Sequence, residues 1–94
     1  MASYNILLKP SVERDLRSLP KTVIARVMRQ IESLEDEPVP RHSVKLVGAE
    51  QLYRIRVGDY RIVYGIDKEV KQILIHYVRH RREAYQVEIR RFRA

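Results

Sequence analysis

Residues 52–64 read LYRIRVGDYRIVY, and their pattern governs the architecture of the chain. Over Leu52–Val57, apolar residues alternate with arginines, which is the two-residue period of a strand with one buried face. Gly58-Asp59 comes next, and a glycine in the first of two turn positions suits a type II′ hairpin. Alternation resumes over Tyr60–Ile66, so the stretch predicts two antiparallel strands joined by a two-residue turn.

This hairpin determines which side chains face each other. A two-residue turn places Arg56 opposite Arg61, with Arg54 diagonal to Arg61 on the same face. Like charges directly opposite one another destabilise a sheet, and a sequence optimised for stability alone would place glutamate or threonine there. We therefore interpret the three arginines as a surface that binds an anion. The alternative is that they are solvated arginines whose stems cover apolar surface.

The residues before the hairpin predict one strand and two helices. Tyr4–Leu8 is a short apolar run and is expected to be the opening strand. A helix is expected from Pro10-Ser11 to Pro20, because proline ends one helix and suits the start of the next. Over Lys21–Glu35 the apolar residues form a stripe with the 3.6-residue period of a second helix.

The residues after the hairpin predict one more strand and a terminal helix. Val70–Arg79 is apolar on both faces, which indicates a buried central strand. Arg81–Arg93 has apolar residues at near-helical spacing and is expected to form a short C-terminal helix. The order β-α-α-β-β-β predicts one α+β domain over residues 1–94, with the two N-terminal helices packed on a mainly antiparallel four-stranded sheet. The helices are expected to cover Tyr53, Ile55, Val57, Ile62, Tyr64 and Ile66.

The charge is distributed unevenly between the two halves. The chain of 94 residues has a formal net charge of +7 and no cysteine. Residues 1–40 hold six basic and six acidic groups, whereas residues 41–94 hold 13 basic and six acidic ones. A neutral half joined to a basic half indicates a scaffold that carries a surface for a polyanion. No stretch has the pattern of a secretory signal or a membrane span, so we expect a soluble, cytoplasmic protein.

A second basic cluster, Arg79-His80-Arg81-Arg82, follows the central strand, and Tyr85 comes shortly after it. Taken alone, His80 is more often structural and Tyr85 more often a core anchor. Beside the hairpin arginines, both become candidates for proton transfer. Guanidinium groups stabilise the charge of a phosphorane, and RNA supplies its own nucleophile, the 2′-hydroxyl. No metal-ligand spacing and no serine or cysteine nucleophile stands out, so the pattern favours chemistry without a metal or cofactor.

The chain resembles the RelE/ParE superfamily of bacterial toxin–antitoxin toxins, and specifically the RelE-type mRNA interferases. The pattern Tyr-Arg-Ile-Arg-x-Gly-Asp-Tyr-Arg-Ile-x-Tyr, followed by His-Arg-Arg-x-x-Tyr, is specific to this resemblance, which covers nearly the whole chain in register. The matching segments are residues 4–6, 16–20, 34–38, 45–48, 52–64 and 78–85.

The resemblance implies a toxin that enters the ribosomal A site and cleaves mRNA there through attack by the ribose 2′-hydroxyl. It assigns the catalytic surface to Arg54, Arg56, Arg61, Arg81 and Tyr85. Well-known members carry lysines where this chain has Arg54 and Arg56. An arginine stays protonated, so these side chains are expected to bind phosphate, and the general base is expected to be Tyr85 or His80. RNA is expected to be bound by Arg54, Arg56, Arg61, Arg79, Arg82 and Lys45.

The resemblance also implies a partner, a small acidic RelB-like antitoxin that wraps the helical and basic surfaces. mRNA and the ribosomal A site are the other expected partners, and no membrane is expected. Two alternatives remain open. The first is a ParE-like gyrase inhibitor, which would have the same fold and no nuclease activity. The second is a non-enzymatic RNA- or ribosome-binding module that leaves RNA intact.

Overall fold

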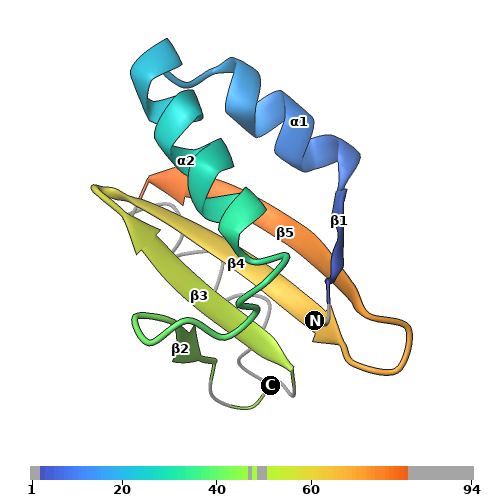
Figure 1. Ribbon diagram of the computed structural model, residues 1–94. Helices are drawn as coiled ribbons and strands as arrows, with labels where there is room; N and C mark the ends of the chain where they lie inside the picture. Colours follow the sequence, from blue (N-terminus) through green and yellow to red (C-terminus); the bar gives the residue numbers. More distant parts are fainter. Residues whose placement is uncertain (1–2, 47, 49–50, 81–94) are drawn as a thin grey trace.

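The computed structural model describes residues 3–46, 48 and 51–80, and it confirms an α+β fold with two helices on one face of a sheet (Figure 1). The elements in chain order are β1 (Asn5–Leu8), α1 (Pro10–Arg17), α2 (Lys21–Ser33), β2 (Val44–Lys45), β3 (Leu52–Val57), β4 (Tyr60–Asp67) and β5 (Gln72–His80). The helix predicted over Arg81–Arg93 lies outside the described residues. In the described ranges, neither helix is long and apolar enough to cross a membrane.

The sheet has five strands in the order β1-β5-β4-β3-β2, one more than the sequence predicts. β1 runs parallel to β5, and all other neighbours pair antiparallel. The additional strand is β2, whose two residues pair with Tyr53 and Arg54 of β3. Two residues are too few to show an alternating pattern, so this strand becomes visible only through its hydrogen bonds to β3.

The hairpin of β3 and β4 has the predicted register. Arg56 is paired with Arg61, so Gly58-Asp59 forms a two-residue turn. Gly58 has a φ of 59°, and Asp59 is not among the residues with positive φ, which is the pattern of the predicted type II′ turn. Glycine adopts this conformation without the steric cost that a side chain would add, so Gly58 sets the position of the hairpin along the chain.

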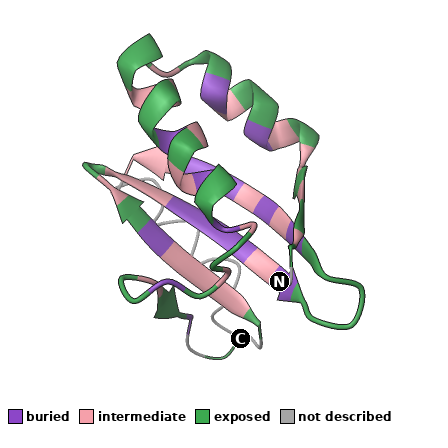
Figure 2. Cartoon of the chain, in the orientation of Figure 1, coloured by how far each residue is buried: buried purple, intermediate pink, exposed green. Residues whose placement is uncertain are grey.

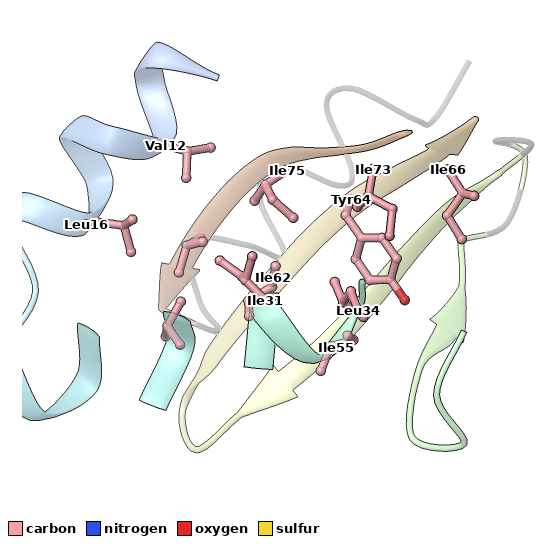
Figure 3. Packing of buried hydrophobic residues seen from close by; sticks show 12 residues of the cluster. Val12, Leu16, Ile31, Leu34, Ile55, Ile62, Tyr64, Ile66, Ile73 and Ile75 are labelled. Atoms are coloured by element: carbon pink, nitrogen blue, oxygen red, sulfur yellow. The ribbon is translucent and has the colours of Figure 1, made fainter. Parts of the chain in front are cut away.

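The main core lies between the helices and the sheet (Figures 2 and 3). Each helix turns one apolar stripe toward the strands, because residues three or four apart share a helix face. The buried members of this core are Val12, Leu16, Val27, Ile31, Leu34, Ile55, Ile62, Tyr64, Ile66, Ile73, Ile75 and Val78. Tyr53 and Val57 pack against them, so the predicted helix-covered face is confirmed.

Tyr64 brings a hydroxyl group into this core. Its side chain is fully buried, and the hydroxyl donates a hydrogen bond of 2.7 Å to the carbonyl oxygen of Pro38. Burial raises the pKa of the Tyr64 phenol to about 12, because the phenolate would lose its hydration. A hydrogen bond with Ser43 opposes this rise, and the nearby Tyr53 adds to it. The hydrogen bond between Tyr64 and Pro38 connects the segment after α2 to β4.

A β-bulge decides which side chains in the second half of β5 face the helices. The register between β4 and β5 shifts by one residue near the middle of the pair, which leaves His76 as an extra residue in β5. Ile75 lies in the helix-covered core before the bulge, and Val78 lies there after it. Because the alternation is inverted at His76, Arg79 belongs to the opposite face, which neither α1 nor α2 covers, and His80 to the helix-covered one.

Candidate nucleic-acid interface

Three arginines form a row across the face of the sheet that lies opposite α1 and α2. Arg56 of β3 is paired with Arg61 of β4, and Arg61 is paired with Arg79 of β5. Opposite residues on antiparallel strands have Cβ atoms about 4.5–5.5 Å apart, so these cationic side chains are immediate neighbours. Arg54 lies two residues earlier in β3 and belongs to the same face. We call Arg54, Arg56, Arg61 and Arg79 the arginine face.

Apolar side chains lie beside the arginines on the same side of the sheet. Leu46, Val63 and Tyr77 form a second buried cluster, and Leu52 packs against it. Val63 is fully buried, and Tyr77 is only 2% exposed, although α1 and α2 both lie on the other side. Val63 is the cross-strand partner of both Arg54 and Tyr77. The arginines therefore project from strands that are packed on both faces, which holds their backbone positions firmly.

Arg79 differs from the other arginines because it reaches an acidic residue of α1. Its Nε lies 3.6 Å from a carboxylate oxygen of Asp15, and its guanidinium carbon lies 5.9 Å from the centre of the Tyr77 ring. At 3.6 Å the contact with Asp15 is an ion pair without a hydrogen bond, and both atoms are buried without a hydrogen-bonding partner. Asp15 thus neutralises part of the charge of Arg79.

The structure does not bring His80 and Lys45 onto the arginine face. His80 is paired with Tyr60, and their rings meet edge to face with centres 5.6 Å apart. This pair lies on the helix-covered face, two positions along the strands from the pair Ile62 and Val78. Lys45 is paired with Tyr53, which also belongs to the helix-covered side. His80 was expected to converge with the arginines and Lys45 to bind RNA, and strand register places both on the helix-covered side of the sheet. The predicted Arg81, Arg82 and Tyr85 lie outside the described residues.

The chemistry available to the arginine face is the binding of anions. A guanidinium group offers a planar fork of donors that matches two phosphate oxygens, and it remains positively charged at any physiological pH. Several such groups on one face can neutralise the extra charge that a phosphate gains when it becomes five-coordinate. Over the described part of the chain, no group of three or more histidine, cysteine or acidic residues is placed to hold a metal ion.

Comparison with known proteins agrees with this fold. The family model described as the ParE toxin of type II toxin–antitoxin systems (parDE) matches residues 6–85. The chain belongs to this toxin family. The match includes the whole hairpin and the strand β5 that carries Arg79, so the family assignment rests on the same segments as the arginine face. The resemblance to the RelE/ParE superfamily is confirmed.

Relatives of this toxin carry the name RelE. A putative toxin RelE1 of Methanocaldococcus jannaschii is 28% identical over 86 residues, covering 88% of this chain and 96% of the relative. The toxin in the archaeal RelE–RelB complex from Pyrococcus horikoshii is 37% identical, with a TM-score of 0.76 over 84% of this chain and 96% of that one. The toxin–antitoxin complex RelBE2 of Mycobacterium tuberculosis matches at 32% identity and a TM-score of 0.74, covering 86% and 94%.

Two arginines that sequence patterns did not single out lie close to the arginine face of the toxin. Arg26 and Arg29 of α2 line a cleft of about 450 Å³ together with Arg56. The first 40 residues carry no net charge, and for that reason they were assigned to the scaffold. One sequence pattern could have indicated this polar face of α2. Its members occur at helical spacing and therefore share one face of the helix: Arg26, Arg29, Gln30 and Ser33.

Proposed function

We propose that this toxin is an endoribonuclease that cleaves mRNA in the ribosomal A site without a metal ion. The observation that carries the proposal is the in-register row of Arg56, Arg61 and Arg79, with Arg54 on the same face. Like charges in this arrangement lower the stability of the sheet, and a bound phosphate would reverse that cost. The concentrated positive charge repels divalent cations, which supports chemistry that relies on guanidinium groups instead.

In the proposed reaction, RNA supplies the nucleophile and the toxin supplies position and charge. The 2′-oxygen attacks the adjacent phosphorus, the bond from phosphorus to the 5′-oxygen breaks, and a 2′,3′-cyclic phosphate remains on the upstream fragment. The 2′-hydroxyl proton passes to a general base, and the leaving 5′-oxygen takes up a proton. Arg54, Arg56 and Arg61 would hold the scissile phosphate and neutralise the charge of the five-coordinate intermediate.

The proton transfers require a group other than arginine, because guanidinium does not give up its proton in proteins. We propose Tyr85 or His80, with Arg81 as a further phosphate ligand and Arg82 and Lys45 as contacts to flanking RNA. His80 ends β5 directly after Arg79, so it lies at the edge of the sheet that the arginine face reaches. The His80 ring packs against Tyr60 on the helix-covered side. A role of His80 in catalysis therefore requires RNA to pass around the edge of the sheet at the end of β5.

Mapping of mRNA ends in cells tests the cleavage directly. Primer extension after induction of the toxin should reveal new 5′ ends within translated codons. A matched message that lacks its start codon should stay intact, because cleavage in the A site requires translation. If both messages remain intact while growth is arrested, the proposed function is wrong. If both are cut, the toxin is a nuclease that acts without the ribosome.

A second candidate function is inhibition of DNA gyrase. It is favoured by the family model, whose description is that of a ParE toxin. Purified toxin added to gyrase and relaxed plasmid separates the two candidates. Loss of supercoiling with intact mRNA would support the gyrase inhibitor. A third outcome, RNA binding with steep salt dependence and neither activity, would identify a non-enzymatic binding module.

We also propose that the toxin is held inactive by a small acidic antitoxin. Related toxins were solved as RelE–RelB and RelBE2 complexes, and the net charge of +7 on this chain attracts an acidic partner. mRNA and ribosomes lie in the cytoplasm, so the proposal places the toxin there. Co-expression with the acidic product of an adjacent reading frame should restore growth and yield a stable complex on purification. A toxin that remains lethal and purifies alone would argue against this partner.

A further inference from the structure

A cleft beside the hairpin turn gathers arginines from two separate elements. Its volume is about 450 Å³, and α2 packs against β3 along one side of it. It is lined on the α2 side by Arg26, Arg29, Gln30 and Ser33, and on the hairpin side by Arg56 and Gly58. This volume lies in the range of small-molecule and nucleotide sites. Because Arg56 also belongs to the arginine face, the cleft and that face meet at one side chain. We call this hollow the α2 cleft.

Two guanidinium groups converge on the backbone of Gly58. A Cβ atom placed on Gly58 would lie 3.5 Å from a terminal nitrogen of Arg26, so the Arg26 side chain rests directly over the turn. The Nε of Arg56 donates a long hydrogen bond of 3.4 Å to the Gly58 carbonyl oxygen. Glycine leaves space for both side chains beside the turn. The two cations are therefore neighbours although they are 30 residues apart in the sequence.

These cations are not neutralised within the described part of the chain. No described carboxylate forms an ion pair with Arg26, Arg29 or Arg56. Asp59 lies at the same turn and lines an adjoining hollow of about 200 Å³ with Arg26, but it forms no ion pair with that arginine. Like charges brought together without a counter-ion repel one another, so the α2 cleft is complementary to an anion.

The lining distinguishes between two kinds of anionic polymer. An acidic protein segment that docks on a surface gains most of its affinity by burying apolar side chains. Among the described residues that line the α2 cleft, only Val57 offers an apolar side chain for that purpose. A phosphodiester needs cationic forks and small polar donors, which the arginines, Gln30 and Ser33 provide. The adjoining hollow is lined by Val23 and Tyr60, and an aromatic side chain next to phosphate ligands suits a nucleotide base.

We propose that the α2 cleft binds a phosphodiester group of an RNA strand, next to the group that the arginine face holds. Arg56 joins the two surfaces, so a strand that crosses the arginine face and bends around the edge of β3 enters the cleft. Arg26 and Arg29 are the binding residues, and neither touches the reacting phosphate. The identity of the ligand rests on the proposed function, whereas its anionic character rests on the cleft itself.

A pair of double variants of the full chain tests this site. Arg26→Gln/Arg29→Gln removes two charges from the cleft, and Arg14→Gln/Arg17→Gln removes two exposed charges at the same spacing from α1, away from the cleft. Glutamine has nearly the helix propensity of arginine, so both proteins should fold, which thermal unfolding verifies. The probe is a fluorescein-labelled oligonucleotide with 2′-O-methyl groups throughout, which cannot be cleaved. Its affinity is measured by fluorescence anisotropy over a series of salt concentrations.

The expected result is a weaker and less salt-dependent complex for the cleft variant alone. Each phosphate contact with a single strand contributes a slope of about −0.7 to the logarithm of the association constant against the logarithm of salt concentration. Loss of the one phosphodiester contact in the cleft should thus lower the slope by roughly 0.7 for the cleft variant, and affinity at low salt should fall by about tenfold. Equal slopes and affinities for the two double variants would overturn the proposal.

A polyglutamate peptide of the same net charge serves as the second probe. If the cleft variant loses affinity for this peptide and binds the oligonucleotide as the wild type does, the cleft is a site for acidic protein and the RNA proposal is wrong. Because the oligonucleotide is not cleavable, this outcome is independent of nuclease activity. If the wild-type toxin binds the oligonucleotide through Arg26 and Arg29 but cleaves no mRNA, the proposed nuclease function is wrong. The proposal that the cleft binds RNA would still stand.

Discussion

The two faces of the sheet use the same strands for different purposes. Toward the helices, β3, β4 and β5 contribute Ile55, Ile62 and Val78 to a large apolar core. On the opposite face the same strands carry the arginine row, beside a buried cluster whose described members are Leu46, Val63 and Tyr77. Successive residues of a strand point to opposite faces, so neighbours in sequence contribute either to the apolar core or to the charged face. The comparison teaches that the two contributions are separable one residue at a time.

Arg61 and Ile62 test this difference between the two faces most directly, because they are adjacent in β4 and their side chains lie on opposite faces of the sheet. Arg61→Ala should lower mRNA cleavage by about 100- to 1,000-fold, since one donor to a developing phosphorane is lost. The measurement is single-turnover cleavage on programmed ribosomes. Arg61→Lys is the control, and it should retain more activity because charge remains although the fork is lost. Full toxicity of both variants would show that the arginine face is the wrong surface.

Ile62→Ala should have the opposite profile. Ile62 is fully buried between the sheet and the helices, and its truncation leaves a cavity. The free energy of unfolding should fall by about 3 kcal/mol, measured by urea denaturation. Ile62→Val removes one methylene group and should cost about 1 kcal/mol. At a temperature where the variants remain folded, RNA binding should be unchanged. Loss of binding by the folded Ile62→Val protein would mean that the two faces are coupled.

The buried hydroxyl of Tyr64 makes the helix-covered face sensitive to alkaline pH. Its pKa in the folded protein is about 12, above the ordinary value of 10 for a tyrosine. Its contribution is thus fully present below pH 10 and is lost as the pH rises toward 12. The full loss should be about 2.8 kcal/mol, since each of the two pKa units corresponds to about 1.4 kcal/mol, and roughly 1.8 kcal/mol of it should be reached by pH 11.5. Urea denaturation at pH 9 and pH 11.5 measures it.

Tyr64→Phe is the matched control for this pH dependence. At pH 9 it should be less stable than the wild type by about 1 kcal/mol, because the Pro38 carbonyl loses its hydrogen bond. Near pH 11.5 this difference should shrink or reverse, since phenylalanine does not ionise. Parallel stability curves for the two proteins would contradict a raised pKa at Tyr64.

The smallest expected effect is a gain in stability on the arginine face. Arg56→Gln removes one of two like charges that face each other across the hairpin, and it should stabilise the fold by about 0.5 kcal/mol at low salt. Salt screens this repulsion, so the gain should shrink at 0.5 M salt. Arg56→Lys keeps the charge and should show no gain. If Arg56→Gln is less stable than Arg56→Lys at every salt concentration, the positive charge at this position stabilises the fold and the predicted repulsion between Arg56 and Arg61 is wrong.

Part of the site follows from sequence patterns, and part of it does not. The cross-strand pair Arg56 and Arg61 was predicted, because one glycine turn sets the register of a hairpin whose strands adjoin in the chain. The two-residue strand β2 was missed, because its pairing partner and not its own pattern creates it. His80 was expected beside the arginines, and the bulge at His76 turns it to the other side.

Local order along the chain was sufficient for the helical stripes, the hairpin turn and the alternation that separates arginines from core residues. Each of these depends on residues close together in the sequence, and the repeat of a helix or a strand fixes the relative directions of their side chains. Contacts between distant segments settled the rest. The bulge in β5 brings Arg79 into line with Arg61, and packing of α2 beside the hairpin brings Arg26 to Arg56. These placements arise from pairing and packing across the fold, which no local period encodes.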